Sequence, residues 1–250
     1  MSGHSKWSTI KRKKGAADAK RGKIFSKLAK EVTVAARDGG GDPDMNPRLR
    51  TVLLACKGAN MPKDNIERAI KKGTGEIPGV TYEDSRYEAY GPGGVAIIVD
   101  TLTDNKRRTV AEIRHIVTKY GGSMAEAGAV TWNFDAKGLI SVSKEGIGDE
   151  DMLEKAIEAG AEDVDSEGDM HELYTDPTEL HAVLHALEEM GVEINEAKLT
   201  MVPKSMVTVD EGTVGTVLKL MEALEEQEDV QDVYSNVEIT DEAMAAAMAE

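Results

Sequence analysis

Residues 138–202 read GLISVSKEGIGDEDMLEKAIEAGAEDVDSEGDMHELYTDPTELHAVLHALEEMGVEINEAKLTMV, and this stretch of sequence says most about the fold. Short apolar runs alternate in it with segments whose apolar residues recur every three or four positions, the spacing of an amphipathic helix. The pattern predicts strands at 139–142, 161–164, 170–174 and 193–202, and helices at 151–159 and 176–190. This β-α-β-β-α-β order is typical of a ferredoxin-like domain.

The segments on either side of this repeat predict a second α/β domain. Before it come strands at 82–90 and 94–102, joined by a Gly-Pro-Gly-Gly turn, then a helix capped by Asp104 that runs to about residue 120, and a strand at 130–134. After it come a helix at 213–226 and a strand at 230–237. We therefore expect one ferredoxin-like domain at 81–134 with 206–240, interrupted by another at 135–205.

The N-terminal part of the chain has helical character throughout. Apolar residues recur at helical spacing over 16–37, where a run of three glycines ends the helix. Asn46-Pro47 is a helix start signal, and Pro62 opens a third helix that ends at Gly73. The predicted fold class is therefore α+β, with a basic arm and three-helix domain at 1–80, the two α/β domains, and a tail at 241–250.

Charge divides the chain more sharply than any other property. The 250 residues have a formal net charge of −16. Residues 1–72 carry 18 Lys and Arg against 7 Asp and Glu, a net charge of +11, whereas residues 133–250 carry 6 against 31, a net charge of −25. Such asymmetry indicates an electrostatic division of labour, with a basic module that meets a polyanion and an acidic remainder that repels non-specific contacts.

The composition and the lack of recognisable targeting motifs predict a cytoplasmic protein. No apolar run approaches the roughly 20 residues of a membrane span, and the polar, basic N-terminus is not a secretory signal. A single cysteine excludes an internal disulfide framework and a cysteine-rich zinc module. We expect no membrane partner.

No motif in the sequence specifies a reaction, and we expect a protein that is not an enzyme. Phosphate-binding loops, a dinucleotide fingerprint and a nucleophile elbow are absent.

His181 and His185 are four residues apart, but Ala182 stands where a zinc protease needs glutamate, so the spacing favours solvent-facing or capping roles. Cys56 lies on an apolar helix face and is expected to be a small buried hydrophobe. Acidic pairs in 145–169 and 222–232 favour a solvated acidic face. We expect no metal, no cofactor and no small-molecule substrate.

Basic residues carry the only chemistry that the sequence offers. Lysines and arginines on the arm and on one face of the first helix can neutralise phosphates, and Trp7 can stack on an unpaired base. A smaller basic patch includes the start of the helix after Asp104. The predicted nucleic-acid-binding residues are Lys6, Trp7, Lys11, Arg12, Lys13, Lys14, Lys20, Arg21, Lys23, Lys27, Lys30, Arg107 and Arg108.

Each basic patch also has a plainer interpretation. The arm can be a solvated tail without a partner, or its tryptophan can fold back on the helical domain. Lys106, Arg107 and Arg108 can be an exposed turn balanced by Asp104 and Glu112. Lysine runs contact phosphates and carry little base information, so sequence-specific recognition is not implied.

Several stretches resemble the YebC family: GHSKW at 3–7, KRGKIF at 20–25, GGGDPDMNPRLR at 39–50, MPKDNIERAIKKG at 61–73, YEAYGPGGVAIIV at 87–99 and NKRRTVAEIRH at 105–115. The resemblance covers essentially the whole chain. It implies an N-terminal helical domain and two α/β domains, one inserted in the other, which agrees with the organisation read from periodicity.

What the resemblance implies about function is divided. Bacterial members are labelled probable transcriptional regulatory proteins that bind DNA. The related mitochondrial protein is a translational activator of cytochrome c oxidase subunit I, and bacterial members are also described as ribosome-linked factors that relieve stalling at proline-rich sequences. Neither role needs catalysis. The basic residues predict nucleic-acid binding, and the resemblance implies a regulator of gene expression, with a ribosome-associated factor that binds ribosomal RNA as the alternative. A protein-interaction scaffold that binds through its acidic domains is a third possibility.

Overall fold

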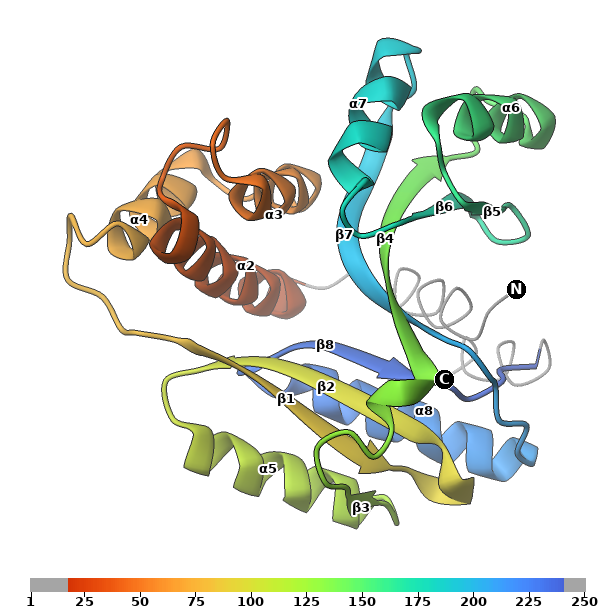
Figure 1. The fold of residues 1–250 in the computed structure, drawn as a ribbon. Coiled ribbons are helices and arrows are strands. Elements are labelled where there is room, and N and C mark those ends of the chain that lie inside the picture. The colour runs from red at the N-terminus through yellow and green to blue at the C-terminus, as the bar shows by residue number, and fades with distance from the viewer. Residues whose placement is uncertain (1–17, 241–250) are drawn as a thin grey trace. The chain divides into compact units, whose positions relative to one another are not determined.

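The computed structural model describes the backbone of residues 18–240 and the side chains of residues 21–240. Residues 1–17, which include the predicted arm, and the predicted tail at 241–250 lie outside this description. Two compact units are present: Ile24–Gly79 packs with Ala136–Met201, and Val80–Asp135 packs with residues 202–240. The helices and strands, in chain order (Figure 1), are α2 (Asp18–Gly39), α3 (Pro47–Gly58), α4 (Lys63–Gly73), β1 (Glu83–Tyr90), η1 (Pro92–Gly94), β2 (Ala96–Thr103), α5 (Lys106–Lys119), β3 (Ser123–Met124), η2 (Thr131–Asn133), β4 (Phe134–Ser143), α6 (Asp149–Ala159), β5 (Asp163–Asp165), β6 (Met170–Thr175), α7 (Leu180–Glu189), β7 (Ile194–Pro203), α8 (Glu211–Glu226) and β8 (Val230–Ser235).

The segment from β4 to β7 has the predicted β-α-β-β-α-β order. Its four strands lie in the order β5-β6-β4-β7, and β6 pairs antiparallel with both β4 and β5. The apolar faces of α6 and α7 form one core with the strands, in which Ile140, Met152, Leu173 and Leu187 are fully buried. The strand order and the two helices confirm the ferredoxin-like domain.

The second sheet repeats this arrangement with its strands in a different chain order. Its strands lie in the order β3-β1-β2-β8, and each neighbouring pair is antiparallel. In both sheets, a helix leads from the third strand to the first, and another helix precedes the fourth strand. The difference is that β1, which occupies the place of β6, comes first in the chain. The domain is therefore ferredoxin-like in its layers and permuted in its connections.

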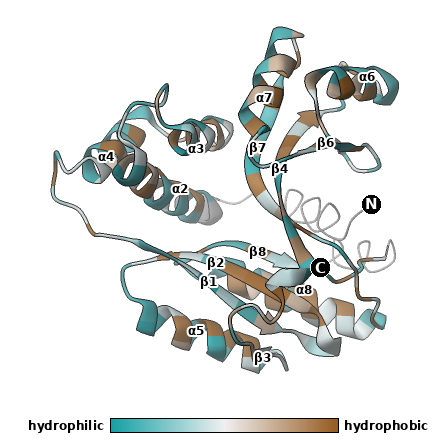
Figure 2. Ribbon diagram, viewed as in Figure 1, coloured by the Kyte–Doolittle hydropathy of each residue, from teal (hydrophilic) through white to brown (hydrophobic). Residues whose placement is uncertain are grey.

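The core of this split domain lies between its sheet and the helices α5 and α8 (Figure 1). Ile97, Val99, Ile113 and Leu220 are fully buried in it. Figure 2 shows β2 as hydrophobic along much of its length, as expected for a strand with neighbours on both sides. The predicted fold class is confirmed: a helical N-terminal domain and two ferredoxin-like domains, one of which interrupts the other. The precise domain boundaries stay a prediction.

The three helices of the N-terminal domain pack around a small core. Val32, Leu49, Cys56 and Ala69 are buried there, with each helix contributing at least one of them. Asn46 joins the first two helices: its Oδ1 accepts from the backbone N–H of Leu49, and its Nδ2 donates to the carbonyls of residues 35 and 40. The predicted cap is therefore confirmed, and the same side chain also holds the end of α2.

Two local predictions are wrong. Residues 130–134 are not a strand: η2 occupies 131–133, and β4 begins only at Phe134. The reason is that the Glu88 carboxylate accepts the backbone N–H groups of Val130 and Thr131, which a strand would donate to a neighbouring strand. The cap of α5 is Asn105, not Asp104, since the Asn105 side chain accepts from the N–H of Arg108.

Candidate nucleic-acid interface

The described cations in the N-terminal half of α2 are less buried than the residues that follow them in the helix. Arg21 and Lys23 are exposed, Lys27 and Lys30 are half-buried, and the later stretch from Val32 to Ala36 is buried throughout. The buried residues Val32 and Ala35 pack in the core of the domain from the second half of the helix, whereas Phe25 and Leu28 in the first half are only partly buried against the same core. The described part of the predicted interface therefore lies at the less buried end of α2.

The predicted patch also includes the arm and Lys20. Residues 1–17 lie outside the described chain, and so does the side chain of Lys20. Their contact with nucleic acid stays a prediction, which concerns Lys6, Trp7, Lys11, Arg12, Lys13, Lys14 and Lys20.

The remaining helices of the domain add exposed cations that the sequence prediction did not select. Arg50 and Lys57 are exposed on α3, and Arg68, Lys71 and Lys72 are exposed on α4. By contrast, the guanidinium of Arg48 contacts the carboxylates of residues 31 and 38 at 2.9 and 3.3 Å. Within this domain, the sequence prediction considered only the arm and one face of the first helix. The net charge of the whole stretch 1–72 is the signal that points to these additional cations.

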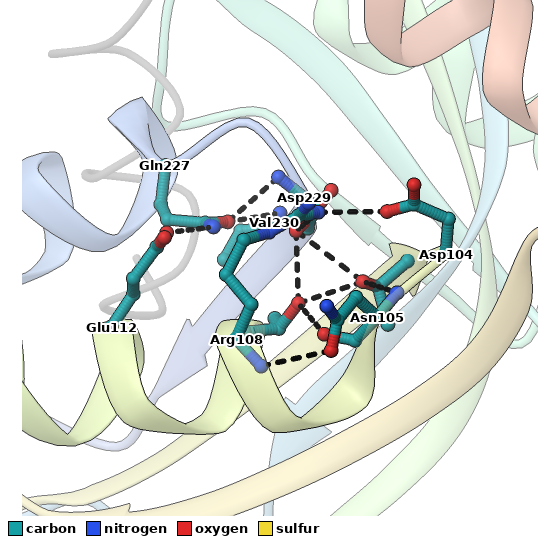
Figure 3. Close-up of polar contacts among 9 residues, drawn as sticks. Asp104, Asn105, Arg108, Glu112, Gln227, Asp229 and Val230 are labelled. Atoms are coloured by element: carbon teal, nitrogen blue, oxygen red, sulfur yellow. Dashed lines mark hydrogen bonds and ion pairs between the residues drawn. The ribbon is translucent and has the colours of Figure 1, made fainter.

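In the second predicted patch, at the start of α5, most cations form ion pairs within the chain (Figure 3). Arg108 Nη2 lies 2.8 Å from Asp104 Oδ1 and 2.8 Å from Asp229 Oδ2. These hydrogen bonds, first the one with Asp229, raise the pKa of Arg108. Lys106 Nζ lies 2.6 Å from a carboxylate oxygen of Glu83, whose hydrogen bond raises the pKa of the lysine. Arg107 is exposed. Asp104 thus balances Arg108 as the plainer interpretation expects, whereas Glu83 and Asp229 are balancing carboxylates that it did not include. Contact of Arg107 and Arg108 with nucleic acid stays a prediction.

Asp229 is the centre of this network and is almost completely buried. Its Oδ2 accepts from the Thr109 hydroxyl at 2.8 Å and from the Thr103 hydroxyl at 3.3 Å, in addition to Arg108. Gln227 extends the network, because its Oε1 accepts the N–H of Asp229 and its Nε2 donates to Glu112 (Figure 3). The interpretation of 222–232 as a solvated acidic face is therefore wrong for Asp229.

The candidates for other chemistry are not assembled into a reactive site. His181 Nε2 lies 2.9 Å from the Thr51 hydroxyl, whereas His185 Nδ1 lies 3.6 Å from Glu189. Within residues 21–240, His, Cys, Asp and Glu side chains form no group that fits a metal ion. Cys56 is fully buried, as expected, and burial raises the pKa of its thiol to about 11. Over the described residues, no helix has the length and apolar character of a membrane span.

Two family models together match most of the chain. The model of the TACO1/YebC N-terminal domain matches residues 5–76, and that of the TACO1/YebC second and third domain matches residues 82–237. The chain belongs to the TACO1/YebC family. This confirms the resemblance read from the sequence motifs.

Relatives of this TACO1/YebC chain match it from end to end. Proteins of Desulforapulum autotrophicum and Geobacter sulfurreducens, each named a probable transcriptional regulatory protein, are both 56% identical to it. The alignments cover 98% and 99% of this chain and all of each relative. The crystal structure of a conserved hypothetical protein from Aquifex aeolicus is 51% identical, with a TM-score of 0.85 over 90% of this chain and 93% of that one.

Proposed function

We propose that this protein is a non-enzymatic regulator of gene expression that binds nucleic acid through its basic N-terminal helical domain. The observation that carries the proposal is the exposure of Arg21 and Lys23 at the end of α2 that lies furthest from the buried stretch of the helix. The family membership and the names of the relatives support a regulatory role.

Charge segregation gives this surface its selectivity for polyanions. Lysine and arginine side chains that neutralise phosphates release condensed counterions, so the affinity falls steeply as salt rises. Residues 133–250, with a net charge of −25, repel the same polyanion, so its main electrostatic contact is with the helical domain. The predicted partner is therefore held by its backbone, and base sequence contributes little to the affinity.

Charge reversal tests the location of the surface. The variant R21E/K23E changes two exposed cations on α2, and K119E/K219E changes two exposed lysines of the split domain by the same amount of charge. We expect R21E/K23E to weaken binding to a 20-base-pair duplex and to lower the slope of log K against log salt by about 1 for each lost phosphate contact. The control variant should keep the wild-type slope. Equal slopes in all three proteins would overturn the proposal.

A competition experiment assigns the polyanion. Labelled protein is offered intact ribosomes together with an excess of duplex DNA at physiological salt, and its distribution is followed by sedimentation. We expect R21E/K23E to reduce whichever complex the wild-type protein forms. Transfer to DNA identifies a DNA-binding transcriptional regulator, whereas retention on ribosomes identifies the translation factor that binds ribosomal RNA.

A further inference from the structure

A second feature suited to nucleic acid lies in the split domain, far from the basic patch in sequence. Trp132 is 68% exposed and Tyr90 is 40% exposed, which is unusual for large aromatic side chains. The indole Nε1–H donates to the carbonyl oxygen of Ala129 at 2.9 Å, and the Tyr90 hydroxyl donates to the same oxygen at 3.2 Å. Two exposed aromatic side chains thus have their polar atoms directed at one backbone acceptor.

These two hydrogen bonds fix the edges of the aromatic rings and leave ring surface to solvent. An indole that has used its only donor within the protein can offer a partner its π-face alone. Hydrogen bonds of this kind also limit rotation of the side chain, which reduces the conformational entropy lost on binding. Trp132 is therefore preorganised for stacking.

The loop beneath Trp132 is held by a buried carboxylate. Glu88 is 6% exposed, and its two carboxylate oxygens accept the backbone N–H groups of Gly128, Val130 and Thr131 at 2.6, 2.6 and 3.0 Å. Burial works to raise the pKa of Glu88, but the backbone hydrogen bonds outweigh it and lower the pKa. An ionised, fully engaged carboxylate therefore fixes the backbone on both sides of the Ala129 carbonyl.

Asn133 fixes the other end of the same loop. Its side-chain oxygen accepts from the N–H and the hydroxyl of Ser205, and its amide donates to the Ser205 carbonyl. The backbone N–H of Lys204 donates to the Asn133 carbonyl at 2.7 Å. Trp132 thus lies between Thr131, which is held by Glu88, and Asn133, which is held by Ser205. The cationic side chain of Lys204 directly precedes Ser205 in the sequence.

We infer that Trp132, supported by Tyr90, is a stacking platform for an unpaired base of single-stranded nucleic acid. This inference rests on the proposed function and adds to it a second contact that recognises unpaired bases. Stacking on an aromatic ring tolerates every base, so the platform distinguishes single strands from duplexes without reading sequence.

The loop around Trp132 offers an aromatic face with one cation nearby. Residues 121–133 contain no lysine or arginine and one carboxylate, Glu126, so the loop offers an aromatic face and not a phosphate site. Lys204 supplies the nearby cation: its Nζ lies 3.1 Å from Asp135 Oδ1, and both side chains are about half exposed. An ion pair between two exposed side chains contributes little to stability, so the lysine can exchange its carboxylate for a backbone phosphate.

Tryptophan fluorescence tests the inference directly. The chain has two tryptophans, so the variant W7F leaves Trp132 as the only indole. We expect a 12-nucleotide oligouridine and a 12-nucleotide oligothymidine to quench its emission saturably, because a stacked base quenches indole. A blunt 12-base-pair duplex should bind, as measured by fluorescence anisotropy of a label on the DNA, without quenching. Quenching by both single strands assigns stacking to the base alone, and quenching by one of them identifies the sugar that the site accepts.

Substitution then measures the contribution of the ring. In the W7F background, W132A should raise the Kd for the single strands about 5- to 150-fold and leave the Kd for the duplex within twofold, in line with about 1–3 kcal/mol per stacked base. W132F should restore most of the affinity, and W132L should not, because leucine keeps apolar area without a π-face. Val80, which is exposed in the same unit, provides the control V80A, for which no change is expected.

The outcomes separate this inference from the proposed function. If single strands bind tightly by anisotropy without quenching Trp132, the platform is overturned while the nucleic-acid-binding function stands. If W132A and W132L release the protein from ribosomes although no oligonucleotide quenches Trp132, the ring contacts a protein and the inference is likewise overturned. If no nucleic acid binds at all, both the inference and the proposed function fail.

Discussion

Arg108 Nη2 and Asp229 Oδ2 lie 2.8 Å apart, although the two residues are 121 positions apart in the sequence. Arg108 is in the first turns of α5 and Asp229 directly precedes β8, so the ion pair joins the two sequence segments of the split domain. The whole inserted ferredoxin-like domain lies between them in the chain. The Arg108 guanidinium, which the sequence predicts to bind nucleic acid, therefore links the two chain segments of the split domain on either side of the insertion.

Arg107 and Arg108 are therefore expected to respond differently to the same substitution. R108A removes the charged partner of a buried carboxylate and should lower the urea midpoint of unfolding, whereas R107A removes an exposed side chain and should leave it unchanged. D229A should cost about 2–4 kcal/mol of unfolding free energy, because it removes the partner of Arg108 and the carboxylate oxygen that the buried hydroxyls of Thr103 and Thr109 share as an acceptor. Equal urea midpoints for R107A and R108A would contradict this account.

The loop that carries Trp132 should depend on Glu88 in a pH-dependent way. E88Q keeps the shape of the side chain but replaces one carboxylate oxygen, an acceptor, with an amide donor that faces backbone N–H groups. The loss of these charge-assisted bonds should cost about 1–3 kcal/mol of unfolding free energy at pH 7.

The sign of the pH dependence follows from the direction of the shift. Burial is outweighed by the backbone donors, so the pKa of Glu88 is lowered from its ordinary value of 4.5. Stability from this group is present above the unfolded-state pKa and is lost as the pH falls through the lower folded-state pKa. Urea denaturation between pH 7 and pH 3 should therefore show a smaller acid-induced loss in E88Q than in the wild type. Parallel losses in the two proteins would show that other carboxylates dominate.

Local sequence patterns were sufficient for most of the fold, because each ferredoxin-like helix buries a stripe of residues at helical spacing. In α7, Leu180, Val183, Leu184 and Leu187 make up such a stripe, and all four are buried. The two-residue strand β3 was missed because two residues show no periodicity. The run at 130–134 looked like a strand because its partner, Glu88, lies about 42 residues earlier in the chain.

The candidate site was less predictable than the fold, since charge alone does not reveal which groups are paired. Asp229 lies among other acidic residues and looked solvated, yet its partners Thr103, Arg108 and Thr109 all lie more than 100 residues away. Trp132 could be read from the sequence only as part of a strand, where an aromatic ring is ordinarily core. Its exposure follows from the hydrogen bonds that Glu88 makes, and those are visible only in three dimensions.

Cys56 should be almost inert in the folded protein. Burial raises the pKa of its thiol from 9.0 to about 11, so the fraction of reactive thiolate falls about a hundredfold from this cause alone. Reaction with iodoacetamide at pH 7.5 should therefore be at least about a hundredfold slower in the native protein than in the same protein unfolded in urea. Comparable rates in the two states would mean that the core of α2, α3 and α4 opens readily. The variant C56A serves as the control for labelling at other side chains.

His181 should make the first compact unit sensitive to mild acid. Burial, aided by the charge of Arg50, lowers the pKa of His181 from its ordinary value of 6.5, while its Nε2 lies 2.9 Å from the Thr51 hydroxyl. A histidine with a lowered folded-state pKa binds fewer protons in the folded than in the unfolded chain, so stability falls as the pH drops below 6.5. Between pH 7.5 and pH 5.5, the urea midpoint of the wild type should therefore fall more than that of H181Q, which does not titrate.

R50Q removes the charge that repels the protonated imidazole, and NMR titration of His181 should then give a pKa closer to 6.5 than in the wild type. An unchanged titration in R50Q would assign the shift to burial alone, and an equal pH response of the wild type and H181Q would remove His181 from the account of acid sensitivity.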